Sequence, residues 1–146
     1  MITGQFRNSL DEKGRLLIPA RIRNEIAGNL LVITRGIDTC LWVFPPEQWK
    51  KVSEGLMAAA SPFTKRARLL QRWIIAPAQE VEIDRSGRIN IPQALQESVG
   101  LDRECIILGL NRYLEIWDVG AYEAYLKESE DEFQEAAEEL GGLISL

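Results

Sequence analysis

Apolar and polar residues alternate in two short stretches of the chain, and the same turn follows each of them. Val81 and Ile83 alternate with acidic residues, which predicts a strand over residues 79–83, and residues 4–10 form the earlier counterpart. Each stretch leads into Asp-x-x-Gly, which is typical of a tight turn, because the aspartate bonds the backbone ahead of it and glycine accepts a positive φ. After the first turn the chain returns through Arg-Leu-Leu-Ile, and after the second through Arg-Ile-Asn-Ile. We expect a β-hairpin in each case, with a loop that ends on an arginine.

A short helix and a second hairpin are predicted after each of these hairpins. Pro19 and Pro92 suit the first turn of a helix, and the apolar residues that follow them are spaced four apart. Gly28 and Gly100 are suited to end these helices. The second hairpins are expected over residues 30–44 and 105–117.

The two series match when the chain is shifted by 73 residues without a gap. Asp11 to Pro19 then lies over Asp84 to Pro92, and both segments read D-x-x-G-R-[LI]-x-I-P. The match continues through residues 11–49 and 84–122, so we interpret the chain as an internal duplication. One such half, of about 40 residues, could hardly bury enough apolar surface to be stable alone. We therefore expect the halves to share one core.

These patterns predict an α+β fold, mainly β, in which two tandem βαβ-type halves form a pseudo-two-fold, interlocked barrel. We place the first half at residues 5–50, a helical connector at 51–77, the second half at 78–121 and an acidic C-terminal helix or tail at 122–146. The connector should hold two helices, one beginning at Pro45-Pro46-Glu47 and one with Ser61 as N-cap. The last helix is expected to begin after Asp118 and to run to about Leu140.

The charge of the chain is unevenly distributed, and this changes what its net value implies. The net charge is −5, but residues 118–146 hold nine acidic residues and one lysine, which leaves the rest of the chain at +3. A mildly basic body with an acidic tail is compatible with binding to DNA. With no apolar run long enough for a membrane span and no signal-peptide pattern, we expect a soluble, cytoplasmic protein without a membrane partner.

Composition also limits the chemistry that is available. The chain has no histidine, which excludes the common histidine-dependent nucleophilic mechanisms. Cys40 and Cys105 are widely separated and are expected to be small buried residues rather than zinc ligands. We predict no metal, no cofactor, no small-molecule substrate and no catalytic residue.

The repeated D-x-x-G-R resembles the MraZ family. The resemblance rests on Phe6, on residues 10–21, on residues 84–92 and on Glu115-Ile116-Trp117, and it extends over roughly residues 3–125. It implies two swapped-hairpin halves of the SpoVT-AbrB type, assembled into ring-shaped oligomers. It also implies a nucleoid-associated regulator of the division and cell-wall gene cluster that binds G-rich direct repeats in double-stranded DNA upstream of its own operon. Two features depart from the family pattern. Ser86 stands in the second loop where the family often has a larger polar residue, and this is expected to weaken the contacts of that loop. The acidic stretch at 128–139 also differs, and we assign no role to it.

The resemblance points to Asp11, Arg15, Asp84 and Arg88 as functional positions, and their chemistry fits. The planar guanidinium of Arg15 could donate two hydrogen bonds to guanine, while Arg88 would either repeat that contact or bind phosphate. Asp11 and Asp84 would close the turns and orient the arginines. The further expected DNA contacts are the backbone at Gly14 and Gly87 and the phosphate-binding side chains Lys13 and Arg85. We prefer the first loop as the base reader and expect the second to depend more on phosphate.

Other interpretations stay open. The aspartates and arginines could simply stabilise tight hairpins. The basic residues Arg21, Arg23, Lys65, Arg68 and Arg72 could contact phosphate or a partner, or could form ordinary solvated surfaces. The chain could also be an assembly module whose basic helix docks a protein and which does not read DNA. An enzyme that uses Asp11 and Asp84 is the least favoured interpretation, since nothing in the sequence indicates a shifted pKa at either carboxylate.

Overall fold

Each half of the chain folds into the same series of elements, and most equivalent elements begin 73 residues apart. The computed structural model describes residues 1–59 and 61–144. Strand β2 begins at Arg15 and β6 at Arg88, β4 begins at Leu41 and β8 at Leu114, and α2 begins at Pro46 and α5 at Val119. The helix after the second hairpin therefore belongs to the repeated unit.

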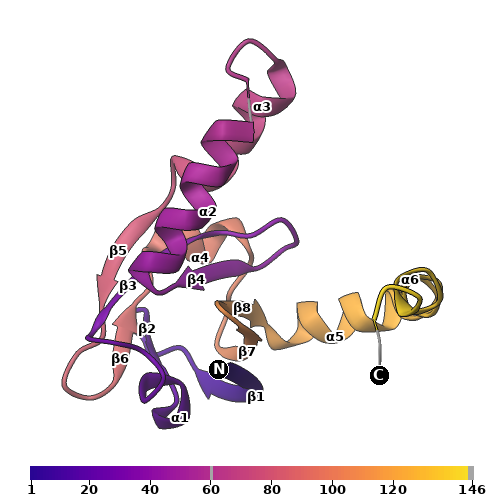
Figure 1. The fold of residues 1–146 in the computed structure, drawn as a ribbon. Coiled ribbons are helices and arrows are strands. Elements are labelled where there is room, and N and C mark those ends of the chain that lie inside the picture. The colour runs from indigo at the N-terminus through magenta and orange to yellow at the C-terminus, as the bar shows by residue number, and fades with distance from the viewer. Residues whose placement is uncertain (60, 145–146) are drawn as a thin grey trace.

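The elements of the first half and of the segment that follows it are β1 (Ile2–Ser9), β2 (Arg15–Leu17), α1 (Ala20–Arg23), β3 (Leu30–Arg35), β4 (Leu41–Phe44), α2 (Pro46–Ala59), α3 (Lys65–Leu70) and the π-helix η1 (Gln71–Ile75). Those of the second half and the tail are β5 (Gln79–Glu82), β6 (Arg88–Asn90), α4 (Gln93–Ser98), β7 (Glu104–Asn111), β8 (Leu114–Asp118), α5 (Val119–Glu128) and α6 (Glu130–Gly141). In Figure 1 the helical hairpin of α2 and α3 and the pair α5–α6 extend from the sheets in different directions.

The two halves exchange their first strands. The larger sheet has the order β1-β7-β8-β4-β3-β5, and all its pairings are antiparallel. Strand β1 of the first half pairs with β7 of the second, and β5 of the second half pairs with β3 of the first. The order is consequently symmetric about the contact between β8 and β4. The duplication thus becomes an approximate two-fold symmetry of the fold.

The return strands of the two turns also pair across the halves. Strands β2 and β6 form a separate two-stranded ribbon, in which Leu16 lies opposite Ile89. Both of these side chains are fully buried in one core cluster, to which the equivalent pairs Ile18 and Ile91, Ile22 and Leu95, and Leu41 and Leu114 also belong. The predicted shared core is confirmed.

The structure corrects several expectations about the strands. The class α+β, mainly β, is confirmed, but within the described residues the sheets are open and form no closed barrel. The first hairpin of each half was expected to close on itself, whereas its return strand pairs with the return strand of the other half. Alternation within one strand predicts only which face is buried, so either pairing satisfies it. The second hairpins, β3–β4 and β7–β8, are confirmed.

The structure also corrects two helix boundaries. Thr64, not Ser61, is the N-cap of α3, and its hydroxyl accepts a hydrogen bond from the Ala67 N–H. Asp118 caps α5 as predicted, through a bond from the Ala121 N–H, but the helix breaks at Ser129, where α6 begins in a new direction.

Cys40 and Cys105 are both fully buried as predicted, and burial raises the pKa of the Cys105 thiol to about 11.

Candidate nucleic-acid interface

The outer face of the β2–β6 ribbon carries the two arginines that end the turns. Arg15 lies opposite Asn90 and Leu17 lies opposite Arg88, so these four residues share one face of the ribbon. Leu16 and Ile89 occupy the other face and are fully buried. The ribbon is therefore a composite element in which each half contributes one arginine.

The first turn fixes both its backbone and its arginine through Asp11. The Asp11 Oδ1 atom accepts hydrogen bonds from the backbone N–H groups of Lys13 and Arg15, each at 2.9 Å. Its other oxygen, Oδ2, accepts a bond of 2.8 Å from the Nε of Arg15. The turn is closed by the bonds Asp11 N–H to Arg15 C=O and Gly14 N–H to Asp11 C=O. Asp11 thus contacts both the turn backbone and the side chain of the arginine that it is expected to orient.

The second turn repeats the backbone but not the ion pair. The Asp84 Oδ1 atom accepts bonds from the N–H groups of Ser86, at 2.8 Å, and of Arg88, at 3.0 Å. Within the part of the chain that the structure describes, Arg88 donates no side-chain hydrogen bond to Asp84, in contrast to Arg15 and Asp11. Asp84 therefore closes its turn without holding its arginine, which corrects the expectation that it orients Arg88.

Both aspartates are stabilised in their ionised form. The backbone N–H of Arg15 holds the pKa of Asp11 below its ordinary value of 3.8, and the N–H of Arg88 does the same for Asp84. A lowered pKa is the opposite of what a general acid or base needs near neutral pH. Their chemistry here is that of fixed acceptors for hydrogen bonds.

The glycines of the two turns have positive φ angles and lie against the opposite half of the chain. Gly14 has φ +78°, and a Cβ built on it would lie 2.6 Å from the Nε2 of Gln96. Gly87 has φ +83°, and its Cβ would collide with the guanidinium of Arg23. Both glycines are buried. The predicted approach of DNA to their backbone is thus replaced by an internal contact, because the side chains of the other half occupy that space.

The contacts of these glycines tie the halves together. Gln96 and Arg23 occupy equivalent positions of the repeat, and each covers the turn of the other half. The Ile18 N–H donates to the Gly87 carbonyl at 2.9 Å, and the Ile91 N–H donates to the Gly14 carbonyl at 2.8 Å. The turns are therefore built into the interlocked core, and only their outer side chains remain for a ligand.

The remaining predicted residues fall into two groups. Lys13 and Arg85 are exposed at the tips of the turns, beside the ribbon, and Arg21 is exposed on α1. Arg23 does not belong to this accessible set, since its guanidinium covers Gly87 and its Nε is buried without a hydrogen-bond partner among the described residues. Lys65 and Arg68 lie on α3, which Figure 1 shows away from the ribbon, and Arg72 lies on η1, which packs against β3. The structure therefore does not bring these three residues to the ribbon.

Asn90 is a candidate that sequence reasoning missed. It is exposed on the outer face of the ribbon, opposite Arg15, at the position equivalent to Leu17. Its amide could both donate to and accept from a base edge. The signal lay in the repeat itself, because Leu17 and Asn90 are the only inequivalent pair within the apolar return strands.

Together, the fold and the turns define a duplicated, strand-exchanged α+β protein with an Asp- and Arg-bearing turn in each half. The chain belongs to the MraZ family. The family model of the MraZ protein matches it twice, over residues 1–73 and 74–142, and these matches confirm the predicted family. No helix among the described residues is long and apolar enough to cross a membrane.

Several relatives match nearly the whole chain. "Transcriptional regulator MraZ" of Treponema denticola is 54% identical over 140 residues, which cover 96% of this chain and 97% of that protein. The proteins of the same name from two strains of Treponema pallidum are 49% identical over 141 residues, or 97% of this chain and 95% of theirs. The solution structure of PHS018 from Pyrococcus horikoshii covers 80% of this chain and 88% of its own, with a TM-score of 0.33 and 13% identity, and a likeness at that level carries no argument.

Proposed function

We propose that this protein is a sequence-specific DNA-binding transcriptional regulator. It acts on the division and cell-wall gene cluster, binds G-rich direct repeats upstream of its own operon and does so as a ring-shaped oligomer associated with the nucleoid. The names of its relatives support the regulatory class. The observation that carries the proposal is the composite ribbon, with Arg15 and Arg88 on one outer face.

The geometry of Arg15 suits a contact with guanine. Asp11 engages the Nε of Arg15, and this leaves the two terminal amino groups as donors. Guanine presents O6 and N7 in the major groove, where a two-stranded ribbon can enter, and a bidentate contact of this kind discriminates by about 1–3 kcal/mol. Arg15 is therefore the base reader in our proposal.

The other side chains of this face have supporting roles. Arg88 is not held by its aspartate, so it can follow a phosphate oxygen or a second guanine as the DNA requires. Lys13 and Arg85, at the exposed tips of the turns, provide sequence-independent contacts to phosphate. Asn90 can read an adenine beside the guanine bound by Arg15.

Repetition of this weak site explains the need for an oligomer. One ribbon offers few phosphate contacts, and each contact weakens as salt rises, so a single copy binds poorly at physiological ionic strength. A ring presents the same ribbon many times, and the second contact then benefits from a high effective concentration. Direct repeats in DNA are the matching target for repeated ribbons.

The proposal is tested by gel retardation with a probe of G-rich direct repeats and a scrambled probe of equal composition. Arg15→Ala should lower the affinity for the repeat probe about 10- to 100-fold and remove the preference over the scrambled probe, with no change in oligomer mass. Lys13→Ala should weaken both probes to a similar degree. Arg112→Ala, in the β7–β8 turn, is the matched control and should change neither.

Unchanged binding by Arg15→Ala would overturn the assignment of the base reader. An absence of salt-sensitive DNA binding in the unmodified protein would overturn the regulatory proposal itself, and would favour a module that only assembles.

A further inference from the structure

Two exposed apolar surfaces of this chain carry opposite charge. Helix α3 and η1, over Lys65–Ile75, contain four basic residues and no acidic one, whereas α6 contains six acidic residues and no basic one. Both elements also expose large apolar side chains. Neither surface is explained by the ribbon that we propose to bind DNA.

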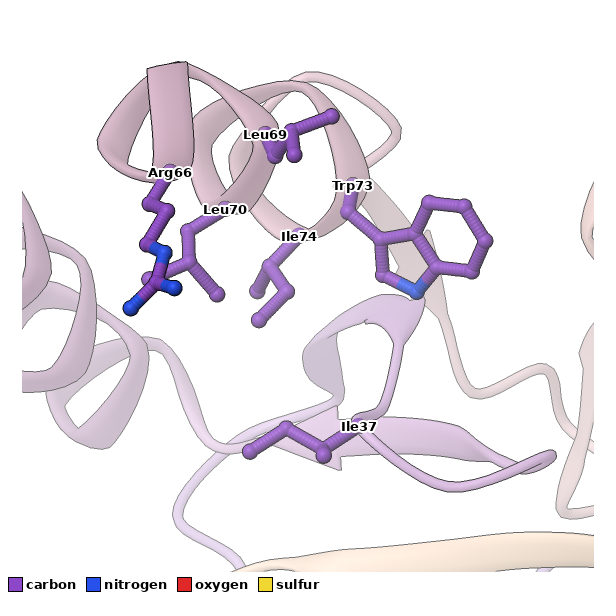
Figure 2. A pocket seen from close by; sticks show the side chains of 6 residues that line it. All are labelled: Ile37, Arg66, Leu69, Leu70, Trp73 and Ile74. Carbon is purple, nitrogen blue, oxygen red and sulfur yellow. The ribbon is translucent and has the colours of Figure 1, made fainter. Parts of the chain in front are cut away.

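The first surface is a hollow of about 520 Å³ between the α3–η1 segment and the β3–β4 loop. It is lined by Ile37, Leu69, Leu70, Trp73 and Ile74, with Arg66 at its rim. Figure 2 shows Leu70 and Ile74 directed from the helix toward the loop that carries Ile37. Ile37 is 71% exposed, Trp73 46% and Leu70 41%, so the lining is largely open to solvent. We call this hollow the connector groove.

The wall of the connector groove is held in place by the sheet beneath it. The buried hydroxyl of Thr34 donates a hydrogen bond to the carbonyl of Ile74. The Arg35 guanidinium lies 3.4 Å from the centroid of the Trp73 ring. The groove is consequently preformed, which lowers the conformational cost of filling it.

The second surface is one side of α6. Phe133 and Leu140 are seven residues apart, which places them on the same side of a helix, and Ala136 and Ala137 lie between them on that side. Phe133 is 66% exposed and Leu140 is 54% exposed, and α6 buries no side chain. Glu130 and Glu132 flank this apolar side, while Glu135 and Glu138 lie on the opposite one. An amphipathic helix of this kind is suited to a hydrophobic groove.

We propose that α6 of one copy binds in the connector groove of the next copy. The apolar side of α6 fills the groove, and its flanking glutamates face Arg66, the basic residue of the groove lining. The occupant is a second copy because α6 and α3 lie on separate arms of the same molecule (Figure 1). The inference rests on the oligomer in our proposed function and names the interface that builds it.

An interface of this kind has a definite consequence for symmetry. The groove of one copy meets a different surface of its neighbour, so an open assembly keeps one free groove at one end and one free helix at the other until it closes. Such head-to-tail contacts produce closed rings or open filaments and not isolated symmetric dimers. Since the interface pairs an acidic helix with a segment that has four basic residues and no acidic one, high salt should weaken it.

The test uses two variants and their mixture, with mass measured by analytical ultracentrifugation. Leu70→Asp places a charge in the groove, and Phe133→Asp places one on the apolar side of α6. Each variant alone should lose the wild-type mass and sediment as a monomer. Mixed in equal amounts, they should form a one-to-one dimer, because one variant keeps an intact helix and the other an intact groove. Glu135→Gln, on the far side of α6, is the control and should keep the wild-type mass.

Wild-type mass in either aspartate variant, or a mixture that stays monomeric while circular dichroism shows both variants folded, would overturn the proposal. Failure here is distinct from failure of the DNA-binding proposal. The monomeric variants should still bind a single G-rich repeat, weakly and in a manner that depends on Arg15. Arg15→Ala should keep the wild-type mass.

Discussion

The two turns of this protein have the same backbone and differ in what they do with their arginine. In both, an aspartate accepts bonds from two backbone N–H groups, and a buried glycine with positive φ contacts the other half. Only in the first turn does the aspartate also bind the guanidinium. The shared core requires the common backbone, whereas recognition of a ligand depends on the side chains, which are free to diverge.

The largest effect should come from the part that the turns share. Leu16 and Ile89 lie opposite each other in the ribbon and are both fully buried, so Leu16→Ala and Ile89→Ala should each lower the free energy of unfolding by about 2–5 kcal/mol. Chemical denaturation at one fixed protein concentration should give a single transition for each variant. Two separate transitions, with only one half affected, would show that the halves do not share a core.

A smaller effect should separate the two aspartates. Asp11→Asn and Asp84→Asn each remove one negative charge near DNA and keep an acceptor for the turn, but only Asp11→Asn removes the bond to an arginine. Because this ion pair is exposed to solvent and therefore weak, preference for the G-rich probe should fall by no more than severalfold in Asp11→Asn relative to Asp84→Asn. Fluorescence anisotropy on both probes measures this ratio. An equal preference in the two variants would remove the distinction between the turns.

The smallest effect concerns the residues that cover the glycines. Gln96 donates a bond of 2.7 Å to the carbonyl of Ile91, whereas the Nε of Arg23, at the equivalent position, is buried without a partner among the described residues. Arg23→Gln makes the two positions alike and should leave stability unchanged or raise it by about 1 kcal/mol. Gln96→Ala is the contrasting variant and should lower the stability by a similar amount. Thermal unfolding of both variants measures these changes in stability. A marked loss of stability in Arg23→Gln would contradict the prediction.

The sequence predicted the parts of the fold that depend on local chemistry. The two Asp-x-x-Gly turns, the second hairpins, the cap at Asp118 and the alternation that buries Leu16 and Ile89 all follow from residue type and spacing. The exchange of β1 and β5 between the halves does not, because the repeated strands have similar patterns and can pair within a half or across the halves. Ser129 breaks the tail helix without a glycine or proline to mark the break.

The site could be predicted to a similar extent. The motif identified Asp11, Arg15, Asp84 and Arg88, but it could not show that only one of the two aspartates binds its arginine. That difference depends on the position of a flexible side chain within a nearly symmetric frame. The packing of the Arg23 guanidinium over Gly87 could not be predicted either, because this contact exists only after the two halves cross.

The most direct test of the central claim, that Arg15 reads guanine from the composite ribbon, combines a change in the protein with a change in the DNA. Replacing guanine by 7-deazaguanine removes the N7 acceptor and leaves the rest of the base pair unchanged. Affinities of the unmodified protein and of Arg15→Ala are measured on the natural and the modified repeat probe. The account predicts that the modified probe weakens binding of the unmodified protein severalfold and causes no further loss in Arg15→Ala. An equal loss in both proteins would contradict it.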